Sequence, residues 1–241
     1  MKVALFIPCL SEHLFPQSAI SMVKVLKHLG MELEYVDGQT CCGQPAFNSG
    51  YRQEVVPVAE HFIELFRDKE CIVSPSGSCV TMVRKFYHDL DIRADLHDAR
   101  NELSGKIFEF TEFLEKVAKV TEIDGSFNHS VTIHDSCHAL RELGIRDYPR
   151  QLLRSIKDLD FIEMEKSDTC CGFGGTFSYK YAEMSIAMVA RKCRYIQESG
   201  AQYVTSTDSS CLMNIQGYLK QHNMQPKAIH IADILAQSLN L

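Results

Sequence analysis

A cysteine pattern that occurs twice constrains the fold of this 241-residue chain more than any other sequence feature. Each copy has a single cysteine, then an adjacent cysteine pair followed by glycine, then a last single cysteine. Corresponding cysteines lie 128, 129 and 132 residues apart along the chain. The first copy holds Cys9, Cys41, Cys42 and Cys79, and the second holds Cys137, Cys170, Cys171 and Cys211. A nearly constant offset indicates internal duplication, so we expect two similar halves, residues 1–125 and 126–241.

Strands and helices are predicted to alternate around these cysteines in both halves. Residues 2–8 and 130–135 are apolar runs typical of buried strands, and residues 16–30 and 179–198 have apolar side chains at helical spacing. Such alternation favours parallel sheets joined by right-handed crossovers. We therefore expect an internally duplicated α/β fold with two pseudo-symmetric halves, whose small parallel sheets are flanked by helices. The charged segment 89–125 is expected to be a helical connection that belongs to the first half.

The cysteines lie just after predicted strands, at the carboxyl ends where open α/β sheets bind their ligands. We therefore expect cysteines that are distant in sequence to converge, four in each half. Glycines follow both cysteine pairs and would let the backbone approach an inorganic centre closely: Gly43, Gly172, Gly174 and Gly175. Glycine-rich loops and helix N-termini also stabilise anionic sulfur.

The residues alone leave the use of these cysteines open. The first residues lack the basic and apolar regions of a signal peptide, so we expect a cytoplasmic protein with reduced thiols. A bond within either cysteine pair is disfavoured, because adjacent Cα atoms are about 3.8 Å apart, closer than disulfides prefer. Four thiolates suit either zinc or an iron–sulfur cluster. A reactive thiol that attacks a disulfide substrate is a further alternative, although the chain has no CxxC motif.

Other cysteines and two histidines receive structural interpretations. Cys71 begins an apolar strand and Cys193 lies in a regular helix, and neither has a counterpart in the other half. Both are expected to be buried core thiols. His134 and His138 flank Cys137, where a role as ligand is open, but a histidine without a counterpart in the other half is more often structural.

Two polar residues and a set of arginines also have simple explanations. Ser76 and Asp208 stand three residues before Cys79 and Cys211, and both fit N-cap residues of the helices that follow. The arginines could dock a carboxylate or an acidic partner, but a solvated helix face is the simpler interpretation. They are Arg141, Arg146, Arg150 and Arg154.

The charge balance limits the classes of partner. The net charge is -6, and the basic residues are scattered rather than grouped in blocks. Nucleic acid is therefore not an expected partner. We also expect no membrane span, because no apolar run is long enough to cross a bilayer.

The motifs resemble those of a known family. Four stretches carry the resemblance to the cysteine-rich CCG domain: TCCGQPAFNSGY at 40–51, SPSGSC at 74–79, CCGFGGTFSYK at 170–180 and CLMNI at 211–215. That domain is seen in one component of heterodisulfide reductase, in the iron–sulfur component of glycolate oxidase and in lactate-utilisation proteins. The sequence is most similar to the lactate-utilisation protein A branch, over essentially the whole chain.

The resemblance implies an iron–sulfur, electron-transfer subunit of a multi-protein system that oxidises L-lactate to pyruvate. Its partners would be iron–sulfur and accessory proteins of that system. The chain would be a non-autonomous part of a lactate dehydrogenase-type oxidoreductase that does not use NAD, and the sequence shows no flavin or nicotinamide motif. The alternatives are a zinc-binding scaffold for partner proteins and a thiol–disulfide oxidoreductase component like that of heterodisulfide reductase.

The resemblance also implies a metal-ligand set in each half. Cys9, Cys41, Cys42 and Cys79 would hold one centre, and Cys137, Cys170, Cys171 and Cys211 the other. In the family pattern the last ligands form a CxxC motif, and here Ser76 and Asp208 replace its first cysteine. Four cysteines per half still suit up to two [4Fe–4S] clusters, and zinc in one half is also chemically reasonable.

Overall fold

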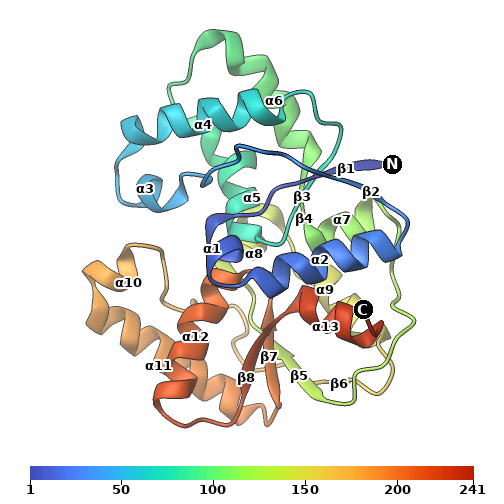
Figure 1. Ribbon diagram of the computed structural model, residues 1–241. Coiled ribbons are helices and arrows are strands. Elements are labelled where there is room, and N and C mark those ends of the chain that lie inside the picture. Colours follow the sequence, from blue (N-terminus) through green and yellow to red (C-terminus); the bar gives the residue numbers. More distant parts are fainter.

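The computed structural model describes residues 1–241 as two similar halves, each built on a four-stranded parallel sheet (Figure 1). The first sheet has the order β2-β1-β3-β4, with β1 Lys2–Leu5, β2 Glu32–Tyr35, β3 Ile72–Ser74 and β4 Ile107–Glu109. The second has the order β6-β5-β7-β8, with β5 Ser130–Ile133, β6 Asp160–Phe161, β7 Tyr203–Ser206 and β8 Lys227–His230. The matching strand order confirms the duplicated α/β fold that the cysteine offsets predict.

Helices form most of the connections between these strands. The first half contains α1 Cys9–His13, α2 Pro16–His28, α3 Gln44–Asn48, α4 Arg52–Phe66, α5 Gly77–Arg84, α6 His97–Lys106 and α7 Phe110–Lys116. The second contains α8 Cys137–Leu143, α9 Asp147–Ser155, α10 Phe177–Lys180, α11 Ala182–Glu198, α12 Ser209–Gln221 and α13 Ile231–Ser238. The helix expected over residues 179–198 is divided at Tyr181 into α10 and α11.

The expectation that segment 89–125 is a purely helical connection was wrong. Ile107–Glu109 forms β4, which pairs with β3 in parallel from Ile72↔Ile107 to Ser74↔Glu109. A strand of three residues is too short to show its own period, and its apolar side chains run on into those of α7. The boundary is set instead by the Glu109 side chain, which accepts hydrogen bonds from the Thr111 and Glu112 N–H groups in the first turn of α7.

Both sheets pack against a shared inner layer of helices (Figure 1). Helix α2 packs against α13 and α7 packs against α9, so each half contributes two helices to this layer. The largest hydrophobic cluster lies there and takes its 24 buried residues from both halves. Towards the centre of the molecule, α5 packs against α8 and α1 against α12. These helices begin where strands end, so the carboxyl edges of the two sheets face one another.

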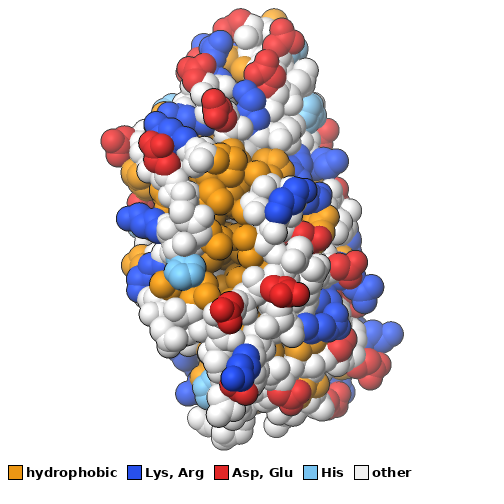
Figure 2. Space-filling view, turned by 90° about the vertical axis from the view of Figure 1, so that its right-hand side faces the viewer, with side chains coloured by type: hydrophobic (Ala, Val, Ile, Leu, Met, Phe, Trp, Pro, Cys, Tyr) orange, Lys and Arg blue, Asp and Glu red, His pale blue; other side chains and the backbone are white.

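Surface charge of both signs is mixed on the face drawn in Figure 2. Acidic and basic side chains are interspersed there around a strip of apolar side chains. None of the helices is both long enough and apolar enough to cross a bilayer.

Candidate metal centres

The eight cysteines of the duplicated pattern all line one cavity of about 310 Å³. The first set comes from the start of α1, the loop before α3 and the first turn of α5. The second set comes from the equivalent places in the other half, namely the start of α8, the loop after β6 and the first turn of α12. The structure therefore brings together every cysteine that the sequence singles out as a ligand.

The helix that carries the last cysteine of each set is capped as the sequence predicts. The Ser76 side chain accepts a hydrogen bond from the Cys79 N–H, 3.3 Å away, at the start of α5. The Asp208 side chain accepts a hydrogen bond from the Ser210 N–H at the start of α12, also at 3.3 Å. Each cap fixes the first turn from which the cysteine sulfur enters the cavity.

The glycine after each cysteine pair donates its N–H to the first sulfur of that pair. The distance is 3.4 Å from Gly43 to Cys41 Sγ and also 3.4 Å from Gly172 to Cys170 Sγ. Both glycines have positive φ angles, 87° and 82°. Neither site has room for a side chain, because a Cβ would lie 2.7 Å from a Val55 methyl group at Gly43 and 2.8 Å from a carbonyl oxygen at Gly172.

The remaining two glycines expected near the centres, Gly174 and Gly175, line the cavity itself. Gly43 and Gly172 do not line the cavity but act through the N–H groups just described. Two of the four glycines thus lie on the cavity wall and two beside the cysteine pairs, and their contact with a bound centre stays a prediction.

Thiols within each set are close enough to share protons. The sulfurs of Cys9 and Cys41 are 3.8 Å apart. Hydrogen bonds from Cys42 and Cys9 lower the pKa of Cys41, and those from Cys137 and Cys171 lower the pKa of Cys170. Each half therefore has one thiol that loses its proton more readily than its neighbours, and metal binding would release the remaining thiol protons.

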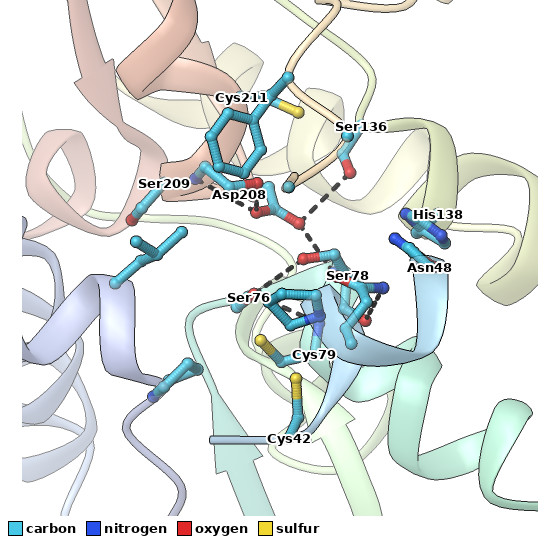
Figure 3. A pocket seen from close by; sticks show the side chains of 18 of the residues that line it. Cys42, Asn48, Ser76, Ser78, Cys79, Ser136, His138, Asp208, Ser209 and Cys211 are labelled. Atoms are coloured by element: carbon cyan, nitrogen blue, oxygen red, sulfur yellow. Dashed lines mark hydrogen bonds between the residues drawn. The ribbon is translucent and has the colours of Figure 1, made fainter. Parts of the chain in front are cut away.

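Asp208 lies between the two sets of cysteines. Figure 3 shows its carboxylate with Cys211 on one side and Cys79 on the other. The Oδ2 atom accepts hydrogen bonds from the Ser78 N–H at 2.7 Å and from the Ser136 hydroxyl at 3.4 Å. Because Ser78 belongs to the first half and Asp208 to the second, this one carboxylate ties the two sites together.

Comparison of the sequence with known proteins shows which family the chain belongs to. Residues 3–84 and 131–216 each match the family model described as cysteine-rich domain, or CCG. The chain belongs to the CCG family. It is 42% identical to Lactate utilization protein A of Oceanobacillus iheyensis, over 98% of this chain and 96% of the relative. It is 40% identical to Lactate utilization protein A of Bacillus subtilis, over 98% of this chain and 99% of the relative.

A solved structure shares the fold at low sequence identity. The crystal structure of a hypothetical protein from Helicobacter pylori superposes with a TM-score of 0.67 and 13% identity. The superposition covers 100% of this chain and 49% of that chain. At this identity the similarity concerns the fold alone.

His134 lies beside the cysteines of the second CCG segment, although the sequence favoured a structural role for it and left a ligand role open. His134 is 1% exposed and follows β5 directly. One of its ring nitrogens and the sulfurs of Cys171 and Cys211 all lie within 4.8 Å of one another. His138 lines the cavity, with Nδ1 3.7 Å from Cys137 Sγ. The position of His134 at a strand end was the sequence signal for a role at the site.

The interpretation of the four arginines as a solvated helix face was wrong for Arg150. Arg141 and Arg146 are exposed, but Arg150 is buried in the second CCG segment and pairs with both oxygens of Asp135 at 2.8 and 2.9 Å. A further ion pair of 2.6 Å joins it to Glu163. Asp135 lies two residues before Cys137, so this buried pair supports the segment that carries a predicted ligand.

A buried lysine near the same site was missed from the sequence. Lys192 of α11 donates hydrogen bonds to the carbonyl oxygens of Lys166 and Ser167, at 2.7 and 3.1 Å. Burial lowers its pKa to about 8. The bonds hold the segment that leads into the cysteine pair of the second half. In contrast, Cys71 and Cys193 are buried core thiols outside the cavity, as predicted.

Proposed function

We propose that this chain is an iron–sulfur, electron-transfer subunit of a protein system that oxidises L-lactate to pyruvate. The observation that carries the proposal is the convergence of two equivalent four-cysteine sets on one cavity. Membership of the CCG family and full-length similarity to proteins named Lactate utilization protein A support the lactate connection. The chain is proposed to work in the cytoplasm, where cysteine thiols stay reduced and free to bind metal.

The residues present fit a four-iron cluster in each half. Four thiolates are the usual ligand set of such clusters, and a bound cluster would supply reversible one-electron chemistry. The chain would supply the ligands, burial and hydrogen bonds to sulfur, and these features set the reduction potential. The paired contacts of Gly43 with Cys41 and of Gly172 with Cys170 are hydrogen bonds of this kind.

Lactate itself is proposed to react on a partner protein. Oxidation of lactate removes a hydride and a proton, which a flavin or nicotinamide cofactor accepts, and the sequence has no motif for either cofactor. Electrons released from lactate would then enter this chain from the partner. The partners that the proposal requires are iron–sulfur and accessory proteins of the same system.

Metal and sulfide analysis of anaerobically purified protein tests the proposal. We expect about eight iron and eight acid-labile sulfide per chain, and half of each in a variant with Cys170→Ser and Cys171→Ser. A Cys193→Ser variant is the control, because Cys193 is buried away from the cavity. Stoichiometric zinc without sulfide would exclude electron transfer. With the partner proteins present, lactate should bleach the cluster absorbance, and lactate added to this chain alone should not.

One observation favours a second candidate, a zinc-binding scaffold that holds partner proteins. The Cys9 and Cys41 sulfurs are 3.8 Å apart. Two thiolates bound at about 2.3 Å to one tetrahedral zinc ion would be separated by about the same distance. The metal analysis above separates the two candidates, since zinc protein is colourless and contains no sulfide.

A further inference from the structure

His134 presents an unpaired polar group to the second cysteine set. Its side chain is 1% exposed, and neither ring nitrogen has a hydrogen-bond partner. Buried polar side chains are nearly always paired, so an unpaired imidazole points to a bonding partner such as a metal ion. The sulfurs of Cys171 and Cys211 are the ligand atoms grouped with it, within 4.8 Å.

Two charged groups near the second cysteine set are already engaged elsewhere. The neighbouring carboxylate of Asp135 gives both of its oxygens to the Arg150 guanidinium. The ammonium group of Lys192 donates to two backbone carbonyl oxygens. The backbone of His134 is fixed by its own N–H, which donates to the Thr205 carbonyl at 2.8 Å. The imidazole is thus held in place by the sheet, forms no hydrogen bond of good geometry, and faces the sulfur of Cys211, whose pKa it helps to lower.

The first half has no equivalent group. The offset of 128 residues between Cys9 and Cys137 places Phe6 at the position of His134. Phe6 is fully buried and packs edge-on against the rings of Phe62 and Phe66, with centroid distances of 4.8 and 6.0 Å. The same fold position is therefore apolar in one half and offers a nitrogen donor in the other.

We propose that His134 is a metal ligand of the second centre beside Cys171 and Cys211, in place of one of the other two cysteines of that set, so that this centre becomes a mixed thiolate and imidazole site. The first centre is then bound by thiolates alone, so the two centres differ in metal preference or reduction potential. Imidazole suits both zinc and iron, and thiolates accept either metal. This inference rests on the proposed metal-binding function of the cysteine sets.

The role of His134 is tested in a variant in which only the second cysteine set can bind metal. In a variant with Cys41→Ser and Cys42→Ser, all bound metal reports on the second half. In that background we compare His134→Phe, which copies Phe6, with His134→Cys, which offers a sulfur donor instead. His222→Phe is the matched control, because His222 lies exposed in the same half. Circular dichroism and thermal unfolding of each variant report whether it folds.

The expected result is a tenfold or greater loss of metal affinity in His134→Phe, recovery in His134→Cys, and no change in His222→Phe. Protein labelled with [15N]histidine should show a directly bonded nitrogen, by hyperfine spectroscopy of a reduced cluster or by X-ray absorption for zinc, where metal–nitrogen distances are about 2.0–2.1 Å. These spectra are recorded on the unmodified His134 protein, so they stand even where His134→Phe fails to fold.

Two other outcomes are distinguishable. Metal bound in the second site with sulfur ligands only, or unchanged affinity in a folded His134→Phe protein, would overturn the ligand assignment and leave the proposed function standing. A wild-type protein that binds no metal in either site would overturn the proposed function and the ligand assignment together.

Discussion

The Asp208 carboxylate accepts a hydrogen bond of 2.7 Å from the Ser78 N–H, across the boundary between the two halves. Ser78 lies in the first turn of α5, and Asp208 is also the N-cap of α12. One carboxylate therefore satisfies N–H groups at the starts of two helices, each of which carries the last cysteine of its set. The positions of Cys79 and Cys211 are coupled through this group. The equivalent residue, Ser76, caps only its own helix.

Replacing Asp208 by alanine should destabilise the protein more than replacing Ser76. Asp208→Ala leaves the buried Ser78 N–H without a partner and removes a charged acceptor, at a cost of about 2–3 kcal/mol. Ser76→Ala removes one cap, at a cost of about 1 kcal/mol. Urea unfolding of the two variants measures the difference. Equal losses would show that the bond between the halves contributes nothing beyond an ordinary helix cap.

The glycines after the cysteine pairs should not tolerate alanine. Gly43→Ala and Gly172→Ala each force a side chain into a left-handed backbone conformation, at a cost of about 1–2 kcal/mol, and add a steric clash. Because each glycine N–H contacts a cysteine sulfur, each variant should lose metal mainly from its own half. Metal content and thermal unfolding, measured together, test both effects.

Gly105 and Gly217 are the matched controls for these substitutions. Both lie within helices, and a Cβ at either position meets no atom within 4 Å. Alanine there should leave metal content unchanged and raise the free energy of unfolding by up to about 1 kcal/mol. A loss of metal in the controls would mean that global stability, rather than the loop at the cysteine pair, governs occupancy.

The convergence of the cysteine sets could be predicted from the sequence, because the duplication fixes their offsets and the strand ends fix their position. The bond from Asp208 to Ser78 could not, because pattern arguments treat each half separately and this contact forms only when α5 and α12 meet. Strand β4 was missed because three residues carry no usable period. Arg150 was assigned to solvent because charged residues are usually exposed, and only the fold reveals Asp135 and Glu163 as its partners.

Arg150 should be essential for the stability of the second half. Arg150→Met leaves the buried Asp135 carboxylate without its partner, and breaking a buried pair in this way costs about 3–5 kcal/mol. Because Asp135 is close in sequence to Cys137, metal should be lost from the second centre before the first. Arg141→Met, at an exposed position of the preceding helix α8, should change neither stability nor metal content. Similar unfolding midpoints for the two variants would contradict the role of the buried pair.

Glu109 should make the protein less stable as the pH rises from about 5 to 8. Burial raises the pKa of its fully buried carboxyl group from 4.5 to about 8. Between these values the folded state keeps the proton that the unfolded state has released, so the free energy of unfolding falls with increasing pH. The effect is at most about 4–5 kcal/mol for a shift of this size.

A Glu109→Gln variant isolates this effect. The amide oxygen can still accept the hydrogen bonds from the Thr111 and Glu112 N–H groups at the start of α7, while the titrating group is gone. The free energy of unfolding of the variant, minus that of the wild type, should therefore increase steadily between pH 5 and 8. Glu102→Gln, an exposed position on α6, should show no such increase. A constant difference for Glu109→Gln across this range would mean that the carboxyl group is already ionised in the folded protein at pH 5.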